Sequence, residues 1–278
     1  MKKYLIIAIM FLITISCSEA FQDRYSKEYL QNKKHVSIIN PLVENYVKKE
    51  IKKSLKKQTG NDFEVVFAGY TVSSIKKGIF KTLEISSENL KIENVPIPYI
   101  NIKTLTDYNY IDYTKNPIVY KSDMTFAYKL DLSEQSINEA LKNKKYQKTI
   151  NKINKLAYPL FNLTNVSIKI AENKLYLVMD YNFPIARASQ DRTFIASTEL
   201  EVKDGKIQAK NVQVDKIYGD LGLNRVAYLI NLLNPLEYTL SLIDSKECKA
   251  KIENINIIDN IIHIDGKMFV KADVNENS

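Results

Sequence analysis

The segment from Met124 to Leu141 reads MTFAYKLDLSEQSINEAL, and it decides the fold class of the chain. Apolar side chains alternate with others over its first nine residues, which is the two-residue period of a strand with one buried face. Ser133 then stands where a helix N-cap belongs, and Ile137, Ala140 and Leu141 share one face of the helix that follows. A strand that runs directly into an amphipathic helix predicts sheets and helices packed on one another.

Further strands lie on both sides of this segment. Upstream, apolar residues alternate over Phe63–Phe67 and again over Leu83–Ile102, where Pro96 and Pro98 indicate an edge or a bend. Downstream, the sequence predicts hairpins with turns at Asn173-Lys174, Asp204-Gly205 and Asp259-Asn260. Consecutive strands joined by short turns favour antiparallel pairing. The predicted class is therefore α+β, with a long curved antiparallel sheet packed on amphipathic helices.

Besides a helical piece over about Tyr146 to Leu160, with Ile150, Ile153 and Leu156, two helices are predicted, one before and one after the central part of the chain. The first runs from about Val36 to Lys57, with Val43 and Val47 on its apolar face and six lysines on the other, and Gly60 ends it. The second covers about Leu223 to Leu242 and is kinked by Pro235. Its apolar face carries Val226, Leu229, Ile230, Leu233 and Leu236.

The N-terminus has the layout of an export signal. Lys2 and Lys3 precede an apolar run of about a dozen residues, which is well short of the ~20 that a spanning helix needs. Cys17 follows this run and resembles the acylated cysteine of a bacterial lipobox, although Thr14 stands where an aliphatic residue is usual. Ordinary signal cleavage after Ala20 is the alternative. Either site predicts an exported protein of the bacterial cell envelope, and lipidation predicts anchoring in the periplasm or at the outer membrane.

The sequence predicts three consecutive parts of the chain. Residues 1–17 form the signal, 18–34 a polar tether, and 35–274 one domain, since no linker rich in Gly, Pro or Ser interrupts them. The formal net charge is +8, but only four of the 40 basic residues are Arg, which disfavours a nucleic-acid reader. Cys248 has no cysteine partner once Cys17 is acylated or removed, so the fold must depend on its core.

The sequence contains little that indicates catalysis. His35 and His263 are the only histidines, and their spacing matches no zinc motif or nucleophile elbow. We expect His263 to be a hydrogen-bonded strand residue. Asp107, Asp112, Asp180 and Asp191 lie near turns or strand ends, and a hydrolase that uses two carboxylates remains an alternative. The sequence therefore predicts a protein that is not an enzyme and has neither a cofactor nor a metal.

A binding role fits the apolar pattern better. A curled sheet that does not close on its helices leaves an elongated apolar cleft, which binds acyl chains by burial at ~0.8 kcal/mol per CH₂. The candidate lining residues are Val43, Val47, Phe126, Tyr128, Leu130, Val226, Leu229, Ile230, Leu233 and Leu236. The same periodicity is equally compatible with a dry core.

Several stretches resemble the LmeA-like family of bacterial phospholipid-binding proteins. They are IINPL (38–42), SIKKGIFKTLEI (74–85), LDLSEQSINEAL (130–141), NLLNPL (231–236) and the Asp265-Gly266 turn region. The resemblance implies a tubular-lipid-binding (TULIP-like) fold, an elongated half-barrel of curved antiparallel sheet around a long helix. It further implies phospholipid binding in the cell envelope, with transfer of lipid between membranes, and no catalytic residues.

The expected function is thus that of a non-enzymatic envelope lipoprotein. Its expected partners are a phospholipid or other acyl lipid in the cleft and a membrane held through the N-terminal lipid anchor, with no nucleic acid. The alternative is a structural or partner-binding envelope lipoprotein with a dry core.

Overall fold

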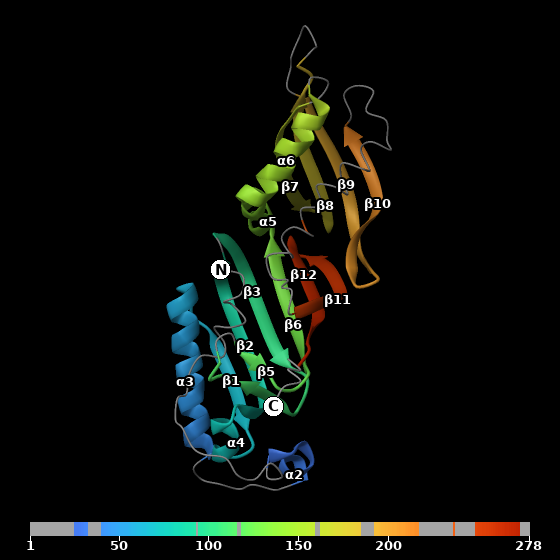
Figure 1. The fold of residues 1–278 in the computed structure, drawn as a ribbon. Coiled ribbons are helices and arrows are strands. Elements are labelled where there is room, and N and C mark those ends of the chain that lie inside the picture. Colours follow the sequence, from blue (N-terminus) through green and yellow to red (C-terminus); the bar gives the residue numbers. More distant parts are fainter. Residues whose placement is uncertain are drawn as a thin grey trace.

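The computed structural model describes residues 25–32, 40–92, 94–115, 118–158, 162–184, 192–216, 236 and 248–272. These residues form an elongated α+β molecule in which every strand pairing is antiparallel (Figure 1). The strands make two sheets, of eight and four strands, and neither closes on itself within these residues. Where the sequence predicted one long sheet, the structure therefore has two, and both lie along the length of the molecule.

The eight-stranded sheet has the order β11-β12-β6-β3-β2-β4-β5, with β1 paired to the free edge of β2. Its strands are β1 (Glu64–Gly69), β2 (Ile79–Ile92), β3 (Val95–Thr104), β4 (Asn109–Asp112), β5 (Val119–Tyr120), β6 (Met124–Ser133), β11 (Cys248–Ile258) and β12 (Ile261–Val270). Pro96 and Pro98 lie in the part of β3 that pairs with β2 alone, since β6 pairs with β3 only from Tyr99 onward. The prolines therefore occupy a local edge, as the sequence predicted.

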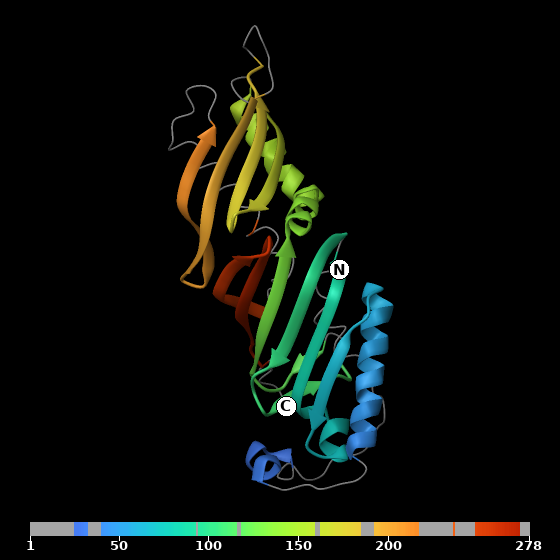
Figure 2. The ribbon, with the colours of Figure 1, turned by 180° about the vertical axis from the view of Figure 1, so that it is seen from behind.

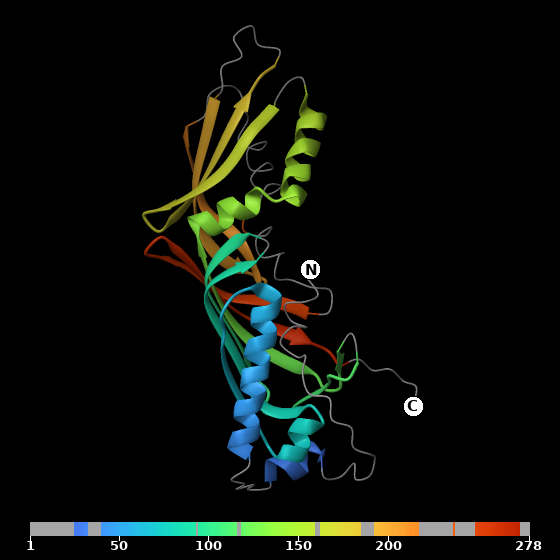
Figure 3. The same ribbon diagram turned by 90° about the vertical axis from the view of Figure 1, so that its left-hand side faces the viewer.

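The four-stranded sheet has the order β10-β9-β8-β7. Its strands are β7 (Asn162–Ala171), β8 (Lys174–Asn182), β9 (Arg192–Lys203) and β10 (Lys206–Lys216). Two helices, α5 (Glu134–Leu141) and α6 (Lys144–Ala157), lie against β7 (Figure 3). The chain thus leaves the large sheet at the end of β6, builds this second sheet, and returns to pair β12 with β6.

Among the described residues, contacts at two places join the sheets. Helix α5 packs on β3 and β6 of the large sheet as well as on β7 of the small one. On the other side, the turn of the β9–β10 hairpin meets β11, where the Ile252 N–H donates to the Gly205 carbonyl at 3.1 Å. The small sheet is therefore held at both sides of the join.

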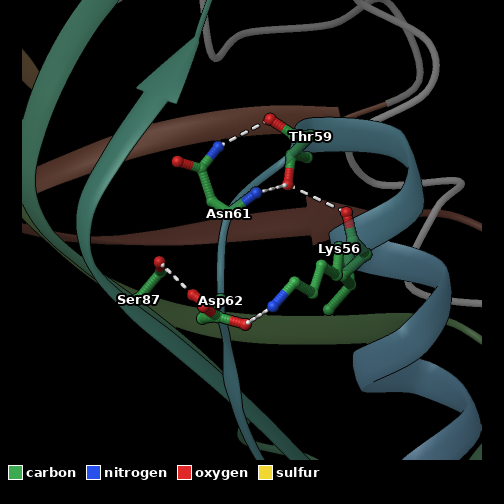
Figure 4. A network of polar contacts seen from close by, with 6 residues as sticks. Lys56, Thr59, Asn61, Asp62 and Ser87 are labelled. Carbon is green, nitrogen blue, oxygen red and sulfur yellow. Dashed lines mark hydrogen bonds and ion pairs between the residues drawn. The ribbon is translucent and has the colours of Figure 1, made fainter.

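Helix α3 (Asn40–Thr59) packs on β1 and is fixed to the sheet at both ends. At its C-terminus, Gly60 takes the left-handed conformation with φ +74°. Asp62, two residues on, accepts from Lys56 Nζ at 2.8 Å with its side chain and from Ser87 Oγ at 2.7 Å with its carbonyl (Figure 4). At the other end, Glu44 Oε1 accepts from the Gly69 N–H at 2.9 Å. The helix cannot slide along β1 without breaking these bonds.

Side chains of α5 and α6 cover the exposed edge of β7. Asn154 accepts from the Leu163 N–H at 2.8 Å and donates to the Leu163 carbonyl at 2.9 Å. Asn138 does the same for Ile168, at 2.8 Å and 2.9 Å. Both carboxamides replace the backbone of a missing neighbouring strand, so at Leu163 and Ile168 this edge does not offer free hydrogen-bonding groups to another chain.

The turns and caps mostly follow the sequence. Asp204-Gly205 and Asp259-Asn260 have positive φ and close two-residue hairpins, and Ser133 caps α5 through a capping box with Ser136. The β7–β8 turn is Glu172-Asn173, one residue earlier than predicted.

Two short helices depart from the predicted pattern. The alternation that begins at Phe63 continues in the sequence through Tyr70 and Val72, which predicts a strand there, but Thr71 caps the short helix α4 (Val72–Lys76) instead. Within the predicted tether, residues 27–32 form helix α2 (Lys27–Asn32), whose Leu30 is buried. The signal, Cys17, residues 18–24 and 33–39, and the predicted helix 223–242 apart from Leu236 lie outside the described residues.

The cap on β7 can be tested by substitution. Asn154→Ala leaves the buried Leu163 backbone groups without partners, so we expect the free energy of unfolding to fall by about 1–3 kcal/mol. Asn151→Ala removes an exposed asparagine from the same helix and should change it by less than about 0.5 kcal/mol. Urea unfolding followed by circular dichroism measures both, and equal midpoints for the two variants would contradict this role of Asn154.

Candidate functional site

The apolar face of β6 is the centre of the candidate site. Phe126, Tyr128 and Leu130 point to the same side of the large sheet and are all buried. Their cross-strand partners on β3 are Thr104, Ile102 and Ile100, and on β12 they are Met268, Gly266 and Ile264. Three adjacent strands thus present one apolar surface, which we call the inner face of the large sheet.

At Gly266 of β12, the Tyr128 side chain comes close to the backbone. A Cβ atom there would collide with the Lys251 carbonyl of β11 and would lie 2.6 Å from the Tyr128 ring. Because Gly266 has no side chain, the Tyr128 ring can pack directly against the backbone of β12 at this position.

The predicted residues of α3 lie at the side of this surface. Val47 is buried and Val43 is partly buried against the same hydrophobic core. The contacts of α3 are with β1, two strands away from β3 in the sheet order. Leu236 is helical, buried, and belongs to the same core as the β6 residues. The structure thus places six of the ten predicted residues in one core, while Val226, Leu229, Ile230 and Leu233 lie outside the described residues.

The prediction missed the second sheet. Its buried face carries Leu175, Leu177, Met179, Tyr181 and Phe194, on β8 and β9. These residues belong to the same hydrophobic core as Phe126 and Leu130. The alternation at 175, 177 and 179 was visible in the sequence, but the sequence does not indicate that this face continues the first one. The apolar interior therefore extends over both sheets.

The opposite face of the large sheet is polar. Here Glu84 accepts from Asn101 Nδ2 at 2.9 Å and lies 3.2 Å from Lys103 Nζ, and both contacts lower the pKa of the Glu84 carboxyl. His263 Nδ1 lies 2.7 Å from Asp131 Oδ1 of the neighbouring strand. His263 is thus a hydrogen-bonded strand residue, as predicted. Cross-strand pairs of this kind are typical of a sheet face in contact with water.

The end of the molecule that contains α2 and α4 is held by tyrosines, and we call it the tyrosine end (Figures 1 and 2). The hydroxyl of Tyr70 donates to the Asp107 carbonyl, that of Tyr113 to the Lys76 carbonyl, and that of Tyr108 to the Tyr25 carbonyl. Burial, and next the charge of Asp107, raise the pKa of Tyr70 from 10.0 to about 12. These three bonds join α2, α4 and the segment around β4.

The predicted carboxylates are dispersed rather than paired. Asp107 accepts from Gln31 at 2.6 Å, Asp112 from Thr114, and Asp180 from Thr193 at 2.8 Å. Asp191 and His35 lie outside the described residues. Among the residues that the structure describes, no group of three or more His, Cys, Asp or Glu side chains is arranged to hold a metal ion. No described helix combines the length and the apolar character needed to cross a membrane.

Comparison with known proteins adds no relative. No family model, curated protein or solved structure matches the chain.

The raised pKa of Tyr70, which follows from its burial and the charge of Asp107, predicts a loss of stability at high pH. Because the folded pKa is raised, the stabilisation is complete below pH 10 and is lost as the pH rises through about 12. Tyr70→Phe should lower stability at neutral pH and weaken its decrease above pH 10. The measurement is urea unfolding at a series of pH values, with tyrosinate absorbance as a second readout. Exposed Tyr158 provides the control Tyr158→Phe, which should leave the pH profile unchanged.

Proposed function

We propose that the protein is a non-enzymatic, exported protein of the bacterial cell envelope that binds the acyl chains of phospholipids along its apolar interior. The observation that carries the proposal is the continuity of this interior. Buried side chains of β2, β3, β6, β8, β9 and β12 belong to one hydrophobic core in a molecule whose sheets are open. A long apolar surface with few polar anchors suits a long apolar ligand.

The resemblance to the LmeA-like family supports the same reading. Two of the quoted stretches fall on described elements: SIKKGIFKTLEI covers the end of α4 and the start of β2, and LDLSEQSINEAL covers the end of β6 and all of α5. A TULIP-like arrangement, in which curved sheet encloses a long helix, would make the inner face a groove for acyl chains. Movement of lipid between membranes would follow from such a groove.

The N-terminal sequence gives the proposal its location. Lipidation of Cys17 would hold the protein at a membrane of the envelope, in the periplasm or at the outer membrane. The intact mass of the protein purified from membranes distinguishes an acylated Cys17 from cleavage after Ala20.

A second candidate is a structural or partner-binding lipoprotein with a dry core. It is favoured by the burial of the candidate residues without any ligand, since Leu130 and Leu236 are each only 1% exposed. Side chains already packed at this density leave no space for an acyl chain unless the core rearranges.

Lipid content separates the two candidates. We expect the protein purified from cells under mild conditions to carry phospholipid, detected by native mass spectrometry and by extraction with organic solvent. Protein that is always free of lipid, and that takes up none from added vesicles, would exclude lipid binding and favour the dry core.

Two neighbouring substitutions locate the lipid. Ile102 lies on the inner face of β3 and is only partly buried, so Ile102→Lys should place a charge against the acyl chains and greatly reduce the bound lipid. Asn101→Lys puts the same residue on the outer face of the same strand and should leave the lipid content unchanged. Circular dichroism verifies that both variants fold. Equal lipid content in the two would place the lipid elsewhere.

A further inference from the structure

The tyrosine end carries exposed apolar side chains next to lysines. Leu105 is 49% exposed and Phe269 is 42% exposed. Both adjoin Thr125 at the start of β6: the Leu105 N–H donates to the Thr125 carbonyl, and Phe269 is the cross-strand partner of Thr125. Tyr29 of α2 is exposed as well, and α2 is joined to the Leu105 segment by the bond from Gln31 to Asp107. Exposed aromatic and aliphatic groups therefore gather around one end of the molecule.

The charges at this end favour an anionic partner. Lys27, Lys76, Lys115 and Lys121 are exposed and form no ion pair within the described residues. The nearby carboxylates accept from neutral groups and keep their charge: Asp107 accepts from Gln31, Asp112 from Thr114, and Asp123 from the Ala272 N–H at 2.8 Å. With Glu28 of α2 they are four, against five exposed lysines when Lys77 is included, so the excess of positive charge is small. Unpaired ammonium groups beside tyrosines and apolar side chains match the head-group region of an anionic bilayer.

The position of Cys17 in the sequence also favours a membrane at this end. Cys17 precedes Tyr25, where the described part of the tyrosine end begins, by eight residues. Eight residues span at most about 28 Å when fully extended. An acyl anchor on Cys17 would therefore keep this end of the molecule, and not the end that contains α6, near the membrane surface (Figure 1).

We propose that the tyrosine end is a membrane-docking surface that binds the head groups of anionic phospholipids and inserts Leu105, Phe269 and Tyr29 into the interface. The tyrosine hydroxyl bonds make this end a rigid platform, since they join α2, α4 and the β4 segment before any membrane is met. Docking by this end would orient the long axis of the two sheets away from the membrane. The inference concerns the surface, and it requires neither a lipid-filled interior nor an acylated Cys17.

Tryptophan reporters test the insertion. The chain contains no Trp, so a single Trp reports only its own site. The protein is expressed with its own signal and with Cys17→Ser, so that no acyl chain holds it. Leu105→Trp and Tyr29→Trp should shift their fluorescence to the blue on vesicles of phosphatidylglycerol and phosphatidylcholine, and be quenched by brominated lipid. Leu156→Trp, at an 89% exposed site on α6, should do neither. A shift at position 156 alone, or at no position, overturns the proposal.

Charge reversal tests the lysines with a matched control. Replacing Lys27, Lys76, Lys115 and Lys121 by Glu should weaken sedimentation with phosphatidylglycerol vesicles by at least about tenfold. Replacing Lys144, Lys148, Lys152 and Lys155 of α6 by Glu changes the net charge equally and should weaken it far less. Equal losses would mean that net charge alone attracts the protein and would overturn the proposal. Purified protein that carries phospholipid but shows no reporter shift would remove the docking surface while leaving the proposed function intact.

Discussion

The pairing of β6 with β12 is the interaction on which the rest of the structure depends. The two strands match over ten residue pairs, from Ser133–Ile261 to Met124–Val270, although more than a hundred residues separate them along the chain. This pairing closes the excursion that builds α5, α6 and the small sheet. It also places Ile264 and Met268 beside Leu130 and Phe126, which completes the inner face. The chain leaves the large sheet at the end of β6 and returns to it at β12, directly beside β6. The small sheet, which is built in between, therefore lies next to the large one.

Polar side chains of the helices form hydrogen bonds with backbone groups at the edges and ends of the sheets. Asn138 and Asn154 form hydrogen bonds with the backbone of Ile168 and Leu163 at the edge of β7, and Glu44 accepts from the Gly69 N–H at the end of β1. A buried backbone group without a partner costs about as much as a lost hydrogen bond, so each of these side chains is worth more than its surface position indicates. They also hold α3, α5 and α6 at fixed positions on the sheets.

The sequence predicts local structure well wherever one residue type is required. Asp204-Gly205 and Asp259-Asn260 mark their turns because few residues accept positive φ, and Ser133 marks the start of α5 because its hydroxyl caps the helix. It fails where two local signals compete and where the decision is made at a distance. Val72 favours a strand by propensity, yet the capping box of Thr71 and Ser74 makes it the first residue of α4. Each strand alternates with the same period, so no pattern reveals that β12 joins β6 or that two sheets share one core. In the sequence, Asn138 and Asn154 look like ordinary solvent-facing helix residues, because nothing local indicates that their partners are Ile168 and Leu163 of β7.

Within the described residues, both ends of the molecule carry exposed apolar side chains and unpaired lysines, since Leu156, Tyr158 and the lysines of α6 are exposed at the other end, but β6 and its inner face begin at only one of them. The tyrosine end has unpaired lysines and exposed Leu105 and Phe269, and β6 begins there with Met124. Along β6 the inner face runs continuously from Met124 past Tyr128 to Leu132, next to α5 and the join with the small sheet. An acyl chain that left a membrane at the tyrosine end would meet apolar side chains at every second position along this strand. The polar outer face, with Glu84, Lys103 and the His263–Asp131 pair, offers no such path. Because Met124, Leu130 and Leu132 are almost fully buried, the proposed binding of lipid along β6 would require the core packed on this strand to open, starting at the tyrosine end.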